Sequence, residues 1–71
     1  MELTIQQALQ QAVAAHNKGN LQQAERIYQA ILQSQPKHPD ANHNLGLIAI
    51  ALGRPETALE LFHKALDVNP K

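Results

Sequence analysis

Two stretches of the chain decide its fold, residues 19–36 (GNLQQAERIYQAILQSQP) and residues 53–70 (GRPETALELFHKALDVNP). When one is laid over the other, the same kinds of residue recur 34 positions apart. The pairs are Gly19 and Gly53, Ala24 and Ala58, Tyr28 and Phe62, Ile31 and Ala65, Leu32 and Leu66, and Pro36 and Pro70. A fixed spacing of this length is the signature of a repeat architecture. We therefore predict one domain, residues 1–71, with a first unit at about 5–38 and a second at about 39–71.

The first unit is predicted to contain two helices. Thr4 and Gln7 have the spacing of a capping box, and the helix that follows should end at Gly19, a residue that favours the left-handed conformation. Asn20 is expected to cap the second helix. That helix should end before SQPKHP, residues 34–39, because its two prolines prevent continuation.

The second unit repeats this arrangement. Its first helix should begin around Pro39 and Asp40 and end at Gly53. Its second helix should begin with Pro55, whose missing N–H costs nothing in a first turn, and end before Pro70. Because no stretch shows the alternation of a strand, we predict an all-α fold of two tandem helix-turn-helix repeats.

Composition excludes several classes of protein. The chain has 71 residues and no cysteine, so it has neither disulfides nor thiolate metal sites. The net charge of +0 lacks the basic excess that binding to nucleic acid or to an anionic membrane requires. The first residues do not form a signal peptide, and no apolar run approaches the roughly 20 residues of a membrane span. We predict a soluble, cytoplasmic protein.

The residues that usually carry chemistry are scattered. His38 and His43 are five positions apart, which does not place them on one helix face, and His16 and His63 belong to other predicted helices. We interpret all four as solvated side chains, because a zinc site needs three or four converging ligands. The sequence also lacks a nucleophile elbow and a phosphate-binding glycine loop. We predict no enzymatic activity, no catalytic residue, no cofactor and no metal.

The spacing of the motif residues resembles that of the tetratricopeptide repeat, a pair of antiparallel helices in 34 residues. In the second unit these residues are Leu45, Gly46, Gly53, Ala58, Phe62, Ala65, Leu66 and Pro70. In the first unit they are Ala12, Gly19, Ala24, Tyr28, Leu32 and Pro36. The resemblance implies a short right-handed α-solenoid of four antiparallel helices. It also implies that Gly46 lies against Ala58 where two helices approach most closely, with Phe62 beside them.

The chain departs from the family pattern in its first helices. The family commonly has a Trp and a Tyr there, at places held here by Ala8 and Ala15 in one unit and by Asn42 and Ala49 in the other. Gln11 stands where the motif has leucine. The first unit is therefore the more degenerate, as terminal repeats often are.

In tetratricopeptide arrays, the first helix of each repeat lines a concave groove that holds extended peptides. By this resemblance the groove residues are Gln6, Leu9, Gln10, Val13, His16, Asn17, Asp40, His43, Asn44, Leu47 and Ile50. Asn44 matches an asparagine that related arrays, including the arm of O-linked N-acetylglucosamine transferases, use against a peptide backbone. An amide suits this task because it donates and accepts at once. The alternative is a solvated asparagine on the helix surface.

The same comparison argues against one kind of ligand. Arrays that bind the C-terminal carboxylate of chaperones use lysine and arginine on this face. The matching places here hold Gln6, Leu9, Val13 and Asp40. A carboxylate clamp is therefore not expected.

The last predicted helix carries apolar residues over about half of its circumference at roughly 100° per residue. Relative to the second helix, Leu59 replaces Glu25 and Val68 replaces Ser34. Soluble arrays normally end with a polar outer face, so a third repeat, a partner or a second copy is expected to cover this one. The candidate residues for self-association are Leu59, Leu61, Leu66 and Val68.

Three interpretations stay open. The chain is an interaction module that binds a partner peptide or helix through the groove or through the last helix. Alternatively, it is an excised or designed two-repeat piece, similar to the N-terminal arrays of bacterial glycosyltransferase-like proteins. In the third, it is a self-assembling unit, a homodimer or higher homo-oligomer formed by stacking or by exchange of helices.

Overall fold

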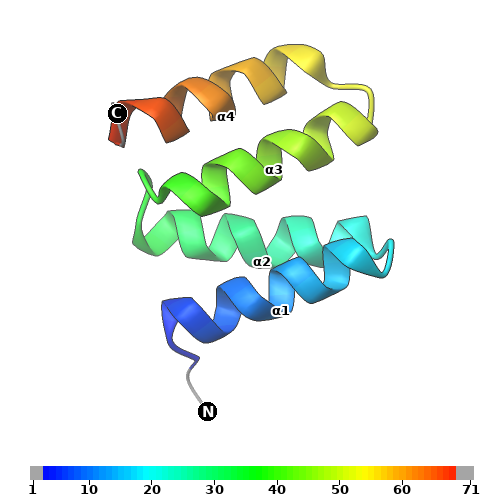
Figure 1. Cartoon of the computed structure of the whole chain (residues 1–71), viewed down its shortest axis with the longest axis vertical. Coiled ribbons are helices and arrows are strands. Elements are labelled where there is room, and N and C mark those ends of the chain that lie inside the picture. The colour runs from blue at the N-terminus through cyan, green and yellow to red at the C-terminus, as the bar shows by residue number, and fades with distance from the viewer. Residues whose placement is uncertain (1–2, 69–71) are drawn as a thin grey trace.

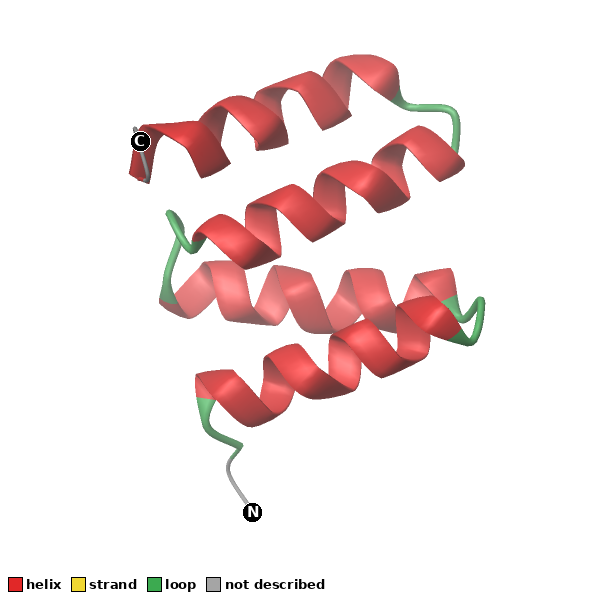
Figure 2. Ribbon diagram, viewed as in Figure 1, coloured by secondary structure: helices red, strands yellow, loops and turns green. Residues whose placement is uncertain are grey.

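The computed structural model describes residues 3–68, and this part of the chain consists of helices and their connections. The helices are α1 (Ile5–Asn17), α2 (Leu21–Ser34), α3 (Pro39–Ala51) and α4 (Pro55–Val68). They lie side by side in chain order, with the two ends of the chain at opposite ends of the stack (Figure 1). Residues 3–68 contain no strand (Figure 2). The predicted all-α fold of two helical pairs is confirmed.

The capping box at the start of α1 is formed as predicted. The Thr4 hydroxyl accepts a hydrogen bond from the Gln7 backbone N–H at 3.0 Å, and the Gln7 side chain accepts one from the Thr4 N–H at 3.0 Å. Two N–H groups that the first turn would leave unpaired are thereby satisfied. The sequence therefore identified the beginning of α1 correctly.

The two turns within the repeats have the same backbone structure. Gly19 has φ +83° and Gly53 has φ +77°, a conformation that residues with a side chain rarely adopt. In the first turn the Asn20 N–H donates to the Ala15 carbonyl at 2.9 Å, and the corresponding bond of the second turn measures 2.8 Å. This is the Schellman arrangement, which ends a helix and satisfies its last carbonyls.

Asn20 does not cap α2, contrary to the prediction. It occupies the N-cap position but its side chain makes no capping hydrogen bond. Its backbone has φ −83° and ψ 71°, outside the extended region that capping side chains normally require. The Schellman turn before α2 fixes this geometry, because it uses the Asn20 N–H.

The connection from α2 to α3 is held by two side chains, His38 and Asn42, for which the sequence predicted no structural role. His38 is the N-cap of α3, where its Nδ1 accepts a hydrogen bond from the Ala41 N–H at 3.1 Å. Asn42 is buried, and its amide donates to the Pro36 carbonyl at 3.2 Å. The interpretation of His38 as merely solvated is therefore wrong.

The core is narrow because more than half of its members are alanines. The contacts between helices pair α1 with α2, α2 with α3, and α3 with α4. The buried apolar residues are Ala12, Ala15, Ala24, Tyr28, Ile31, Ala41, Leu45, Ile48, Ala49, Ala58 and Leu61. Seven further apolar side chains pack against them while partly exposed, among them Leu32 and Phe62.

The ring of Phe62 lies beside Gly46, as the resemblance implied. That Gly46 and Ala58 mark the closest approach of the two helices stays a prediction. A Cβ atom at Gly46 would lie 2.6 Å from Cε1 of Phe62, so the aromatic ring occupies the space that the glycine leaves open. Long side chains on a helix lean toward its N-terminus, which carries the ring back over the turn where Ala58 lies. Ala58 itself is buried in the core.

Candidate binding surfaces

The eleven predicted groove residues lie on α1 and α3, and none of them is buried. Leu9, His16 and Asn44 are half-buried, and the other eight are exposed. Val13 and Leu47 hold equivalent places in the two repeats, as do Gln10 and Asn44. The two first helices therefore present an apolar and an amide position from each repeat. That they form one continuous groove stays a prediction.

The Tyr28 hydroxyl lies near two of these residues, Asn44 and Asp40. Tyr28 is fully buried on α2, and its hydroxyl has no hydrogen-bond partner among the described residues. Burial raises the pKa of the Tyr28 phenol, the nearby Asn44 amide lowers that pKa, and the charge of Asp40 raises it. Asn44 and Asp40 are thus close enough to influence the hydroxyl, but no hydrogen bond of ordinary geometry joins Asn44 to it.

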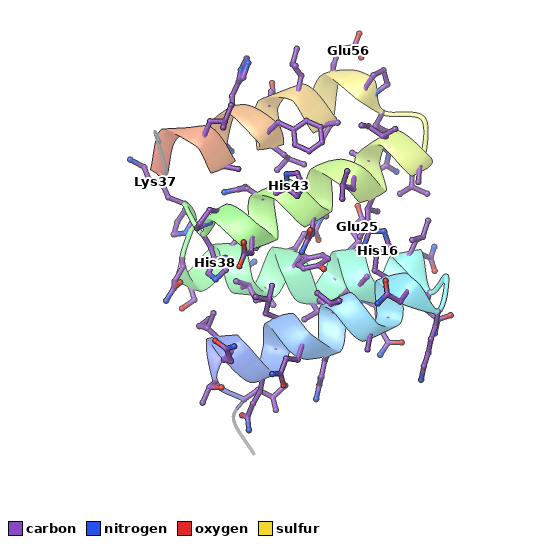
Figure 3. The ribbon with its side chains drawn as sticks, in the orientation of Figure 1. His16, Glu25, Lys37, His38, His43 and Glu56 are labelled. Atoms are coloured by element: carbon purple, nitrogen blue, oxygen red, sulfur yellow. The ribbon has the colours of Figure 1, made fainter. Side chains whose placement is uncertain are left out.

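His43 has a contact that the sequence did not reveal. Its ring centroid lies 5.4 Å from that of Phe62, with an angle of 47° between the planes. Figure 3 shows His43 on α3, on the side toward α4. This exposed groove residue therefore also takes part in the packing of α3 on α4. A periodicity argument assigns each position to one face and did not detect this double role.

The exposed apolar surface of α4 is confirmed for two of the four residues proposed for self-association. Leu59 is 57% exposed and Leu66 is 64% exposed. Leu61 is only 9% exposed and belongs to the core, so its inclusion in this surface is wrong. It lies on the side of α4 that packs on α3, as its counterpart Ile27 packs on the core in the first repeat. The Val68 side chain lies outside the described residues.

A shallow apolar depression lies at the opposite end of the stack. It has a volume of about 530 Å³ between α1 and α2, and most of its lining is apolar. The apolar residues around it are Leu3, Ile5, Ala8, Ile27, Ala30 and Ile31. Ala8 stands where the repeat commonly has a tryptophan. The missing aromatic side chain was the feature of the sequence that could have indicated this depression.

A single ion pair links the repeats within the described chain. The Arg54 guanidinium lies 3.4 Å from the Glu25 carboxylate and joins the turn before α4 to α2. The Arg54 side chain is more than half exposed, so the pair contributes at most about 1 kcal/mol.

Comparison with known families agrees with this architecture. A family model described as the tetratricopeptide repeat matches residues 15–71, most of the chain. The chain belongs to the tetratricopeptide repeat family. The match begins within α1, in the tetratricopeptide unit that the sequence predicts to be the more degenerate. No curated protein and no solved structure matches the chain.

Family membership sets a general expectation for the chain. Tetratricopeptide repeats are generally non-catalytic modules for protein–protein interaction, and stacked repeats create extended binding surfaces. The narrower likeness to glycosyltransferase arrays stays a prediction. None of the described helices combines the length and the apolar character needed to cross a membrane.

Proposed function

We propose that the chain is a non-enzymatic interaction module that binds an extended peptide across α1 and α3. The observation that carries this proposal is the half-buried Asn44 on α3, which lies near the unpaired Tyr28 hydroxyl. An amide restricted by its neighbours loses little freedom on binding, and it can both donate to and accept from a peptide backbone. Gln10 supplies the same chemistry from the first repeat.

The ligand is expected to be weakly charged and partly apolar. Lysine and arginine are absent from the eleven groove residues, and Asp40 is their only carboxylate. Val13, Leu47 and Ile50 are large apolar side chains that remain exposed. A peptide with apolar side chains and an accessible backbone would cover these three residues while pairing with the amides. The proposal therefore excludes recognition of a carboxylate terminus.

A peptide-library screen followed by substitution tests this proposal. Asn44→Ala should weaken the best peptide several-fold, because about 1 kcal/mol of hydrogen bonding is lost, while the melting temperature is kept. Gln29→Ala removes an exposed amide from α2 and is the matched control. If both variants bind as tightly as the parent, Asn44 is a solvated surface residue.

We also infer a second candidate, self-association through α4, because Leu59 and Leu66 are exposed. A twofold dimer is the simplest arrangement, since one patch can be self-complementary. The contact should be weak, because two leucines cover far less than the roughly 800 Å² that each partner buries in a stable complex.

Sedimentation across protein concentration tests the second candidate. The parent should associate below about millimolar concentration, and Leu59→Glu, which copies Glu25 of the second helix, should make it monomeric. Leu47→Glu changes an exposed leucine on α3 and serves as the control. A parent that remains monomeric up to that concentration contradicts the candidate.

A further inference from the structure

The internal repeat shows what the exposed side of α4 is shaped to contact. Helix α2 packs on both α1 and α3, whereas α4 packs on α3. The positions that are more exposed on α4 than on α2 are therefore the positions at which α3 covers α2. Three such pairs stand out. Half-buried Glu25 and Leu32 on α2 correspond to exposed Leu59 and Leu66 on α4. Buried Tyr28 corresponds to half-buried Phe62. We call Leu59, Phe62 and Leu66 the α4 stripe.

The same comparison identifies the residues of α3 that cover α2. Helix α3 packs on α2 and on α4, whereas α1 packs on α2. Three residues of α3 are buried although their counterparts on α1 are exposed. These residues are Ala41, Leu45 and Ile48, and their counterparts are Gln7, Gln11 and Ala14. The helix that fits against α2 thus carries a small, a large and a large apolar residue at positions i, i+4 and i+7.

The geometry points to a docking site on the α4 stripe for an amphipathic partner helix with this α3-like pattern. The docked helix would lie against α4 as α3 lies against α2, which continues an interface that the chain already contains. The site rests on the proposed role as an interaction module but uses a different face from the groove. Loss of docking on α4 therefore leaves peptide binding across α1 and α3 intact, and the two failures are distinguishable.

The α4 stripe differs from the matching surface of α2 in one charged contact. The Glu25 carboxylate on α2 lies 3.4 Å from the guanidinium of Arg54, a residue in the turn that follows α3. Leu59 takes the place of Glu25, so an arginine at the same point of a docked helix would face leucine. The preferred partner helix consequently ends in an apolar or uncharged residue where α3 is followed by Arg54. Because Arg54 is more than half exposed where it pairs with Glu25, the loss of that pair disfavours an identical copy of the second repeat only slightly.

A second copy of the chain is a poorer occupant of this site. Its α3 pattern is already covered by its own α2, and its α1 offers Gln7, Gln11 and Ala14 at the matching places. Stacking copies end to end would therefore set glutamine amides against the leucines of the stripe. A docked α3-like helix would compete with any α4 contact between copies, because both cover Leu59 and Leu66.

The deciding experiment attaches the partner helix directly. Lys71 is the counterpart of Lys37, so residues 38–52 (HPDANHNLGLIAIAL) can be added after Lys71 in register with the repeat. The matched control adds residues 4–18 (TIQQALQQAVAAHNK), a segment of equal length that forms α1 but carries the polar pattern. Each extension is made on the parent chain and on Leu59→Glu, and thermal unfolding is followed by circular dichroism.

The α3-type extension should raise the unfolding midpoint by about 5 °C or more, the shift expected when the free energy of unfolding of a domain of this size increases modestly. The control extension should raise it by less than half as much, and Leu59→Glu should remove most of the difference. Equal midpoints for the two extensions would overturn the proposal. A gain that survives Leu59→Glu would also overturn it, since the added helix would then lie elsewhere. Amide chemical shifts at Leu59 and Leu66 give an independent readout of docking.

Discussion

Substitution of Gly46 by alanine provides a sharp test of how α3 and α4 pack. The new Cβ atom would lie 2.6 Å from Cε1 and 2.9 Å from Cδ1 of Phe62, closer than side-chain carbons normally approach. Overpacking of this kind costs about 1–3 kcal/mol. Helix propensity opposes that cost, since alanine is favoured over glycine in a helix interior by about 1 kcal/mol.

The free energy of unfolding should therefore fall by about 1 kcal/mol, at the lower end of the range for overpacking. The ring is half-buried and can move, at the expense of its contact with His43. The first repeat holds Ala12 and Tyr28 at the same places, both buried, so a methyl group and a ring fit when the helices are spaced for them. The unfolding midpoint should fall by about 4–8 °C.

A double-mutant cycle with Phe62→Leu separates the two contributions. Leucine lacks the outer ring atoms that approach Gly46, so Gly46→Ala should stabilise this background by about 1 kcal/mol through helix propensity alone. Urea unfolding of the four proteins, followed by circular dichroism, measures the free energies. If Gly46→Ala stabilises both backgrounds equally, the ring does not occupy the space beside Gly46 and the reasoning is refuted.

Three further predictions concern polar groups. Tyr28→Phe should leave the stability unchanged or raise it by up to about 1 kcal/mol, because it removes a buried unpaired hydroxyl. The folded-state pKa of Tyr28 lies above the ordinary 10.0, so its contribution to stability is complete below that pH and is lost as pH rises through the folded-state pKa. Tyr28 is the only tyrosine and tryptophan is absent, so phenolate absorbance follows this titration, and Tyr28→Phe should unfold less readily in alkali. Thr4→Ala and His38→Ala should each cost about 0.5–2 kcal/mol in urea unfolding, whereas Asn20→Ala should cost far less, and equal losses would contradict the capping assignments. Asn42→Ala should cost about 1–3 kcal/mol and speed hydrogen exchange where α2 meets α3; unchanged exchange there would show that the bond to Pro36 contributes nothing.

The bounds of the helices were predictable because local chemistry determines them. Thr4 and Gln7 cap α1 through bonds within four residues, and Gly19 and Gly53 supply the backbone conformation that each turn needs. Pro55 begins α4 as expected. These features depend on neighbours in the sequence, so sequence alone reveals them. The 34-residue repeat then indicated that the two pairs share one architecture.

The contacts between helices were harder to predict because they depend on where side chains lean. The repeat pattern placed Phe62 beside Gly46, but it did not show that a Cβ atom at Gly46 would lie 2.6 Å from the Phe62 ring. The helical projection also assigned Leu61 to the outer surface of α4, although Leu61 is buried and belongs to the core. The groove residues were placed by resemblance, and their exposure permits binding without demonstrating it.

The pairing of each helix with its neighbour in the chain has a kinetic consequence. Contacts between segments close in sequence give a low contact order, so folding should be fast, in the range of microseconds to milliseconds. In such a linear array the terminal elements have fewer neighbours and exchange their amide hydrogens earlier than the interior. The amides of α4, whose main contacts among the described helices are with α3, should therefore exchange before those of α2 and α3. Local opening of α4 then exposes Leu61 and uncovers the side of α3 that carries Gly46.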